Sequence, residues 1–257
     1  MRKIPVALTV TLAALPFIAG SMVALAAQAP NQSPMMSFFV TSEGPGKGAN
    51  LGGLAGADLH CQMLATAVGA GGKTWRAYLS TQAHPGQPAI NARDRIGTGP
   101  WYNFKGDMIA RDLAHLHGDT IEQARLGNNI TKVSDLTEKG QVVPGLYDGI
   151  HADDREIPYM RAHPESNRHE TLTGSMPDGR AFTDNADHTC NNWTSEATGD
   201  TSGNLRANTG PNAQVGMSDR NGGGNGSWNS AHGTFGCSLK DLGRTHGIGM
   251  YYCFAVN

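Results

Sequence analysis

Three groups of histidine and acidic residues have side chains that could bind a metal ion. They are His115 and His117 with Asp119, His151 with Asp153 and Asp154, and His163 with His169 and Glu170. Imidazole nitrogens and carboxylate oxygens are ordinary zinc ligands. No group has the histidine pair four residues apart, or the Cys-x-x-Cys pair, that makes a zinc site specific. The sequence therefore favours solvated polar side chains at all three places and leaves metal binding unassigned.

A short segment beginning at Asp219 resembles the start of a calcium-binding loop. Asp219, Arg220 and Asn221 are followed by three glycines, and carboxylate and amide oxygens are the ligands that calcium prefers. A loop of the EF-hand type also needs a bidentate glutamate at its end, but Ser230 stands at that position. We therefore predict no cofactor, and calcium stays an alternative that no motif supports.

The common catalytic motifs are missing from this chain. It has no Gly-x-Ser-x-Gly, no His-Glu-x-x-His and no phosphate-binding Gly-x-x-x-x-Gly-Lys-Ser segment. Two carboxylates can hydrolyse a glycosidic bond, and Asp153 with Glu170 would supply such a pair. We interpret the chain as a protein without catalytic activity. The alternative is a secreted hydrolase that acts on polysaccharide through acidic residues of segment 106–170.

A tryptophan is the most distinctive side chain of the Gly-, Asn- and Ser-rich segment 196–235. Trp228 has little apolar sequence around it, and an aromatic ring can stack on the face of a sugar. It could equally anchor this long segment onto the rest of the domain. The candidate binding residues are Trp228, Asn229, Asp219 and Trp193.

Polar side chains also cluster just before the second cysteine. Asp184, Asp187 and His188 precede Cys190, and such residues either line pockets or make hydrogen bonds within turns. The sequence favours the turns.

Four cysteines follow an N-terminal segment that is typical of an export signal. Met1-Arg2-Lys3 is basic, residues 4–25 are almost uncharged and apolar, and two Ala-x-Ala sites follow within residues 24–29. The alternative is a membrane anchor, because about 20 apolar residues can span a bilayer. We interpret residues 1–29 as a signal peptide and expect a secreted or periplasmic protein without a membrane span after cleavage.

In such an oxidising compartment the four cysteines are expected to form disulfides. They are Cys61, Cys190, Cys237 and Cys253. Four cysteines allow three pairings, and the residues alone do not choose among them.

Composition narrows the class of partner. The formal net charge is −2, and losing Arg2 and Lys3 with the signal makes the chain more acidic, which argues against nucleic acid as a partner. The 34 glycines predict a loop-rich chain. Residues 30–257 have a length that suits one large domain.

A few segments carry clear periodicity. Residues 37–41 and 74–80 are predicted strands, and the apolar positions between Ala57 and Val68 predict a helix that buries Cys61. Residues 249–256 are apolar at every position, which predicts a strand in the middle of a sheet. Segments 106–170 and 196–235 are polar. We expect the first to be an insertion that leaves the core, with a short helical turn near 119–125. We expect the second to be a loop without a core of its own.

Five motifs, in order along the chain, resemble endostatin, the C-terminal globular domain of certain collagens. They are Gly53-Leu54-Ala55-Gly56-Ala57-Asp58-Leu59-His60-Cys61, Trp75-Arg76-Ala77-Tyr78-Leu79-Ser80, Pro100-Trp101-Tyr102-Asn103-Phe104-Lys105, the run from Thr173-Gly174-Ser175 to Cys190-Asn191-Asn192-Trp193, and Tyr252-Cys253. The resemblance spans most of residues 38–257 and is interrupted at about 106–170 and 196–235.

This resemblance implies an α+β, C-type-lectin-like fold: a twisted mixed sheet with one or two flanking helices and long loops. It also implies the pairs Cys61–Cys253 and Cys190–Cys237. The chain departs from the family elsewhere. The predicted mature N-terminus has no histidine for the zinc cluster of animal endostatins. The chain has a net negative charge, which does not suit binding to the polyanion heparin. Trp228-Asn229-Ser230 lacks the aspartate of the motif with which C-type lectins bind sugars through calcium.

Together these observations predict a secreted, lectin-like binding protein. Its partner would be a glycan, or a protein of a cell surface or matrix, met through the two long polar segments.

Overall fold

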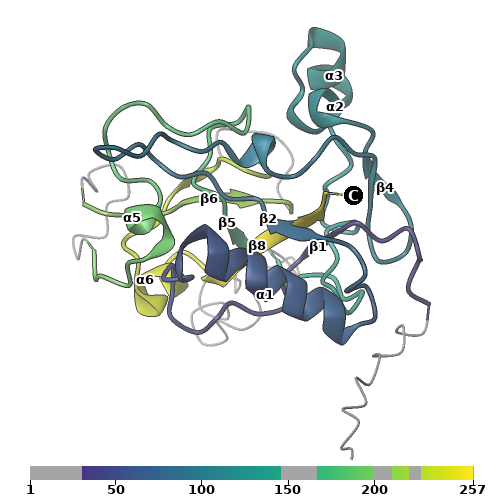
Figure 1. The fold of residues 1–257 in the computed structure, drawn as a ribbon, viewed down its shortest axis with the longest axis horizontal. Helices are drawn as coiled ribbons and strands as arrows, with labels where there is room; N and C mark the ends of the chain where they lie inside the picture. The colour runs from purple at the N-terminus through teal and green to yellow at the C-terminus, as the bar shows by residue number, and fades with distance from the viewer. Residues whose placement is uncertain (1–30, 146–166, 200–209, 220–226, 257) are drawn as a thin grey trace, which may run out of the picture.

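The computed structural model describes residues 31–145, 167–199, 210–219 and 227–256 (Figure 1). The predicted signal peptide lies outside the described residues, as do residues 146–166, 200–209 and 220–226 of the two long polar segments.

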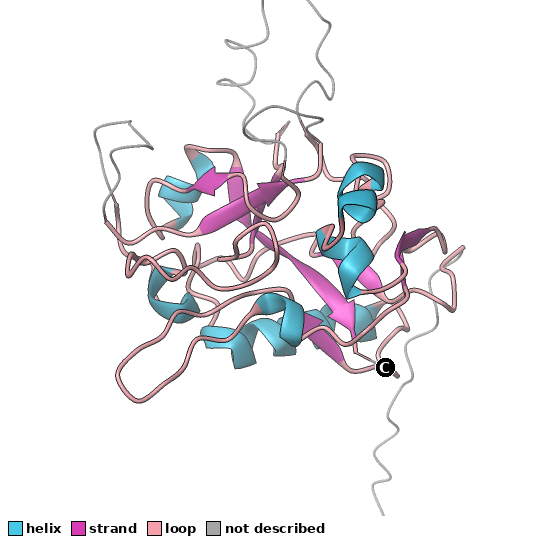
Figure 2. Cartoon of the chain, turned by 90° about the horizontal axis from the view of Figure 1, so that it is seen from above, coloured by secondary structure: helices cyan, strands magenta, loops and turns pink. Residues whose placement is uncertain are grey.

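The chain folds into short strands and helices joined by long loops (Figure 2). The strands are β1 (Phe38–Val40), β2 (Trp75–Ala77), β3 (Trp101–Tyr102), β4 (Met108–Ala110), β5 (Glu170–Leu172), β6 (Gln214–Met217), β7 (His232–Gly233) and β8 (Gly247–Ala255). The helices are α1 (Gly53–Ala67), α2 (Leu113–His117), α3 (Ile121–Leu126), α5 (Cys190–Trp193) and α6 (Leu239–Gly243), with a 3-10 turn η1 at Ala92–Asp94. Among the described helices, none is both long and apolar enough to cross a membrane.

The last strand organises the core, as its sequence predicts. Alternate residues of a strand point to opposite faces, and both faces of β8 are covered. Tyr251, Cys253 and Ala255 join one cluster of buried side chains, which includes Cys61, Trp75 and Trp193. Met250, Tyr252 and Phe254 join the other, which includes Phe38, Tyr78 and Trp101. A strand with two buried faces has no room for polar residues, which explains its unbroken apolar sequence.

The main sheet is mixed. Strand β8 pairs with β1 and β2 in antiparallel orientation and with β5 in parallel orientation. Beyond β5 the sheet continues through β6 to β7, and β3 pairs with β4 in a separate two-stranded sheet. The architecture is therefore α+β with a mixed sheet and few helices; the more specific C-type-lectin-like fold stays a prediction.

Helix α1 forms where the periodicity predicts it and begins a few residues earlier. It buries Ala57, Asp58, Cys61 and Ala65 against the sheet. The buried Asp58 carboxylate accepts hydrogen bonds from the Arg95 guanidinium at 2.7 and 2.8 Å and from the Ala77 backbone N–H at 2.9 Å. A buried charge needs such partners, so this contact fixes α1 against β2 and η1.

Both disulfides that the endostatin resemblance implies are present. Cys61–Cys253 joins α1 to β8 across 192 residues, and Cys190–Cys237 closes a loop of 47 residues that contains β6 and β7. All four sulfurs are thereby paired. The two bridges are compatible with an oxidising compartment.

The described part of segment 106–170 contributes more to the core than its polar composition predicts. Ile109, Leu116 and Ile130 pack into the second buried cluster, on the side of Tyr78 and Tyr252. These apolar residues are separated by turns and short elements, so no regular period connects them. Helix α3, which the sequence predicts as a helical turn, buries no residue and projects with α2 from the rest of the molecule (Figure 1).

Segment 196–235 also contains more structure than predicted. Strand β6 pairs with β5, and β7 pairs with β6, so this part of the chain extends the main sheet. The expectation of a loop is wrong for residues 214–217, which form a strand and are all buried. Their backbone groups are paired by neighbouring strands, which composition does not reveal.

Candidate ligand-binding site

The described parts of the two polar segments meet at a pocket of about 750 Å³. One wall consists of α2, α3 and the turn after them, and the other of the end of β6 and residues 227–229. Its lining residues are Leu116, His117, Gly118, Ala124, Arg125, Gly127, Asn128, Ile130, Thr131, Pro177, Met217, Ser218, Ser227, Trp228 and Asn229. We name it the Trp228 pocket. Ligand sites are typically concave, with apolar walls and a few fixed polar groups.

Trp228 is both an anchor and part of this wall. Its ring centroid lies 4.9 Å from that of Tyr78, 5.4 Å from that of Tyr252 and 6.0 Å from that of His117. The Tyr252 hydroxyl donates a hydrogen bond to the Trp228 carbonyl oxygen at 3.0 Å. Trp228 is nevertheless only partly buried, so an aromatic surface is presented to the pocket in a fixed orientation.

Asn229 has a structural role under the pocket floor. Only 1% of the residue is exposed. Its amide nitrogen donates to the Tyr78 hydroxyl at 2.9 Å and to the Pro177 carbonyl oxygen at 3.1 Å, and its amide oxygen accepts from the Ser227 hydroxyl at 2.9 Å. These bonds position the adjacent Trp228. Asn229 therefore shapes the site rather than offering an open hydrogen-bonding group to a ligand.

The contacts and the burial of His117 determine its state. His117 Nδ1 donates to the Leu113 carbonyl oxygen at 2.9 Å, because a carbonyl oxygen can only accept. In the neutral ring Nε2 is then the acceptor, and it accepts a hydrogen bond from the Tyr78 hydroxyl at 2.8 Å. Burial lowers the pKa of His117 to about 4, so the imidazole is neutral near pH 7 and the floor of the pocket carries no charge from it.

The rim of the pocket supplies a cation. Arg125 is exposed on α3 and lines the pocket. Asn128 is committed to the fold, since its amide donates to the Leu116 carbonyl oxygen at 2.7 Å and accepts from the Ile130 N–H at 2.9 Å. Thr131 is exposed at the same rim. The site thus combines one aromatic ring, one guanidinium and hydroxyl groups.

Two other predicted binding residues have buried side chains. Trp193 is 0% exposed, and its indole N–H donates to the Ser80 carbonyl oxygen at 2.7 Å. The carboxylate of Asp219 is 3% exposed and lies 2.9 Å from His169 Nδ1. Both side chains are therefore engaged inside the protein, and neither is open to a ligand in this structure. An isolated tryptophan or aspartate in a polar sequence does not reveal such partners.

The described histidines of the predicted metal groups are occupied by other contacts. Both ring nitrogens of His115 are engaged, one with the Arg111 N–H and one with the Gly127 carbonyl oxygen. Asp119 pairs with Arg93 at 2.6 Å. His151, Asp153, Asp154 and His163 lie outside the described residues. Within the described ranges no cluster of three or more potential ligands is found.

The acidic pair of the hydrolase alternative receives no support. Glu170 is 2% exposed, and its carboxylate contacts the Thr245 hydroxyl at 2.7 Å and His232 Nε2 at 3.1 Å. Burial raises the pKa of this carboxyl. The Glu170 carboxyl therefore joins β5 to β7 and to the turn after α6, and it is not a lining residue of the pockets described here. Its predicted partner Asp153 lies outside the described residues.

A buried acid lies directly behind the Trp228 pocket. The hydroxyl of Ser218, a lining residue, donates to Asp135 Oδ2 at 2.5 Å. The other oxygen of Asp135 has no hydrogen-bond partner among the described residues. Burial raises the pKa of Asp135 to about 7, and the nearby charge of Asp219 acts in the same direction. Protonation of Asp135 is therefore coupled to folding.

We predict that Asp135→Asn changes how stability depends on pH. The folded protein keeps a proton on Asp135 up to about pH 7, whereas the unfolded chain releases it near pH 4. For this group alone, the free energy of unfolding falls as the pH rises between those values, by roughly 1.4 kcal/mol per unit. His117, with its lowered pKa, gives the opposite slope between about 4 and 6.5.

Because the two slopes oppose each other, the comparison of variants is more informative than the wild-type curve. The stability of Asp135→Asn relative to wild type should increase steadily from pH 5 to pH 7, as measured by urea unfolding. Glu122→Gln, at an exposed position on α3, is the control. A constant difference between Asp135→Asn and wild type would contradict the buried-acid assignment.

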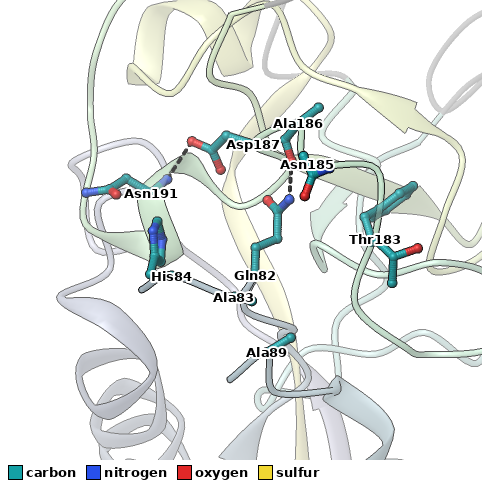
Figure 3. A pocket seen from close by; sticks show the side chains of 10 residues that line it. Gln82, Ala83, His84, Ala89, Thr183, Asn185, Ala186, Asp187 and Asn191 are labelled. Atoms are coloured by element: carbon teal, nitrogen blue, oxygen red, sulfur yellow. Dashed lines mark hydrogen bonds between the residues drawn. The ribbon is translucent and has the colours of Figure 1, made fainter. Parts of the chain in front are cut away.

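A second pocket, of about 530 Å³, lies beside residues 82–89 and 182–191 (Figure 3). Asp187 lines it and also accepts hydrogen bonds from the backbone of Thr189 and Asn191 at 2.9 and 2.8 Å. Asp184 is exposed and pairs with His188 at 2.9 Å. The sequence left two roles open for these acids, lining a pocket or making contacts within turns. Asp187 does both, and Asp184 makes a turn contact. We name this the Gln82 pocket.

No protein-family model matches the sequence, and no curated protein matches it significantly. The endostatin resemblance therefore rests on its five motifs and stays a prediction. The function is argued from the two pockets.

Proposed function

We propose that the chain is a secreted, lectin-like binding protein that takes part of a glycan into the Trp228 pocket. The observation that carries this proposal is the Trp228 ring, which tyrosines and a neutral histidine fix in place at the wall of a concave site. An aromatic ring in a fixed orientation suits a sugar face, because it stacks on C–H groups without losing side-chain freedom on binding.

The shape of the site favours a glycan over a protein surface. A protein partner normally needs about 800 Å² on each side, whereas a concave pocket of about 750 Å³ accommodates one or two sugar rings. Arg125 and Thr131 at the rim would hydrogen bond to ring substituents, and the ring of Trp228 would supply the apolar contact. The secreted location is part of the proposal and is supported by the two disulfides.

Trp228→Ala alone cannot test this proposal, because the ring also packs on Tyr78 and Tyr252. We expect it to lower binding and the melting temperature together. Arg125→Ala is a better test, because it should change binding without changing stability. Arg125 is exposed and lies in a helix without buried residues. Glu122→Ala, exposed on the same helix but outside the pocket, is its matched control.

We predict that a glycan array with the purified protein, run with calcium and with chelator, identifies a bound glycan. Arg125→Ala should then weaken binding at least about tenfold, the worth of one hydrogen bond to a charged group, while its melting temperature stays that of Glu122→Ala. Titration calorimetry measures both variants. If Arg125→Ala and Glu122→Ala bind the glycan with equal affinity, the glycan does not bind in the Trp228 pocket. If the protein hydrolyses a glycan of the array, the alternative of a secreted hydrolase is favoured.

A further inference from the structure

The Gln82 pocket is built by two segments that are about 100 residues apart in the sequence and are joined by amide groups. The Gln82 side chain donates to the Ala186 carbonyl oxygen and accepts from the His188 N–H at 2.6 Å. The Asn192 side chain accepts from the Gln82 N–H at 2.8 Å and donates to the Gln82 carbonyl oxygen at 3.0 Å. These bonds hold the two walls at a fixed separation, so the cavity needs no ligand to form.

One side of this pocket rests on an unusual backbone. Cys190, Asn191, Asn192 and Trp193 have φ angles of 49, 54, 53 and 67°, so α5 is a single left-handed turn. Residues with a Cβ rarely adopt this region, and four in succession are costly. The Cys190–Cys237 bridge, the buried Trp193 and the Asn192 amide hold the turn. Strain of this kind often accompanies ligand sites.

The strained turn places a polar side chain at the pocket. Asn191 is exposed and lines the cavity, and its backbone N–H is held by Asp187 Oδ2 at 2.8 Å. Thr183, Asn185 and His84 are also exposed lining residues. Figure 3 shows that these side chains come from both walls of the same space. The Asn191 amide also donates to the Thr194 hydroxyl at 2.9 Å. A pre-formed cavity lined by a few polar side chains is the arrangement of a binding site.

The chemistry of the lining selects the ligand class. Amides and hydroxyls can each donate and accept, which matches neighbouring hydroxyl groups of a sugar. The Phe182 ring, packed on His188 at 4.0 Å between centroids, adds an apolar surface. Asp187 is the acidic residue of the described lining, which includes no lysine or arginine. The Asp187 carboxylate therefore repels anionic ligands.

We propose that the Gln82 pocket is a second binding site, selective for neutral saccharides over acidic ones. It is separate from the Trp228 pocket and goes beyond the function proposed above, because it adds a site whose charge excludes uronates and sulfated sugars. A protein with two sugar sites would bind a polymeric glycan more tightly than a short one, because the second contact is intramolecular.

Glycine substitutions at two lining positions test this site without disturbing the backbone. Asn191 and Asn185 have φ angles of 54 and 63°, which glycine adopts more easily than asparagine. Asn191→Gly with Asn185→Gly therefore removes both amides and adds no strain to the turn; it also removes one exposed hydrogen bond, from the Asn191 amide to the Thr194 hydroxyl. Asn31→Gly is the matched control, because Asn31 has a φ of 66° and lies outside the pocket.

The probes are cellotriose, maltotriose and mannotriose, with trigalacturonate as the acidic counterpart, and the readout is saturation-transfer NMR with a titration. We expect wild type and Asn31→Gly to bind at least one neutral trisaccharide. Any binding of trigalacturonate should be lost in Arg125→Ala, because the Trp228 pocket carries that cation. The double glycine variant should bind the neutral trisaccharide at least about fivefold more weakly at an unchanged melting temperature.

Each other outcome overturns this inference. Three results would each exclude a neutral sugar site here: binding of no neutral probe by wild type, a preference for trigalacturonate that persists in Arg125→Ala, or equal binding by the double glycine variant and Asn31→Gly. If Arg125→Ala weakens the neutral probe and the glycine variant does not, the Trp228 pocket is the site and the glycan proposal stands without a second one.

Discussion

Replacing Cys61 and Cys253 together by alanine should cost more stability than any other change we consider. A disulfide restricts the unfolded chain in proportion to the logarithm of the loop it closes. For a separation of 192 residues the expected loss in the free energy of unfolding is about 5 kcal/mol, against about 4 kcal/mol for the separation of 47 between Cys190 and Cys237. The Cys61–Cys253 variant also loses buried contacts, because these cysteines lie where α1 packs on the central strand β8. This increases the difference between the two variants.

Urea unfolding of the two double-alanine variants measures this difference. Both variants should have a lower free energy of unfolding than the wild type. The variant without the Cys61–Cys253 bridge should have the lower value of the two. A larger loss for the Cys190–Cys237 variant would show that the left-handed turn and β6, rather than the contact between α1 and β8, dominate the cooperative fold.

Trp193→Ala should lower the free energy of unfolding by about 3 to 5 kcal/mol, the usual cost of truncating a buried aromatic side chain. The indole is fully buried and donates to the Ser80 carbonyl oxygen. The surrounding space is tight, since a Cβ added to Gly174 would lie 2.6 Å from the Trp193 ring. The loss in the free energy of unfolding therefore has two causes: the cavity that the indole leaves, and the buried Ser80 carbonyl oxygen that loses its hydrogen bond.

Trp193→Phe separates these two contributions. It keeps most of the apolar contact and loses the hydrogen bond, so its cost should be well below that of alanine. Chemical denaturation measures both variants. A loss under about 1 kcal/mol for Trp193→Ala would contradict the assignment of Trp193 to the core and return it to the candidate ligand residues.

Regular periodicity was enough to predict the centre of the fold. Strand β8 and helix α1 lie where their apolar patterns place them, because each buries a face whose repeat matches the backbone period. The disulfide pairing came from the endostatin resemblance. The residues alone left three pairings open, since partner cysteines are brought together by tertiary structure that no local pattern encodes.

The sites were less predictable, for a physical reason. The Trp228 pocket forms between α3 and residues 227–229, which are about 100 positions apart, so Arg125 gave no local signal of its proximity to Trp228. The Gln82 pocket depends on the left-handed turn at Asn191. Asparagine tolerates that conformation, but two adjacent asparagines predict an ordinary turn equally well.

Tryptophan fluorescence tests the central proposal most directly. The chain has four tryptophans; Trp75, Trp101 and Trp193 are at most 1% exposed, whereas Trp228 is partly exposed at the pocket. Quenching of the folded protein by acrylamide therefore reports Trp228. If a glycan identified on the array stacks on this ring, a saturating concentration should reduce the quenching, and Trp228→Phe should abolish the change. Unchanged quenching of the wild type at saturation would contradict glycan binding in the Trp228 pocket.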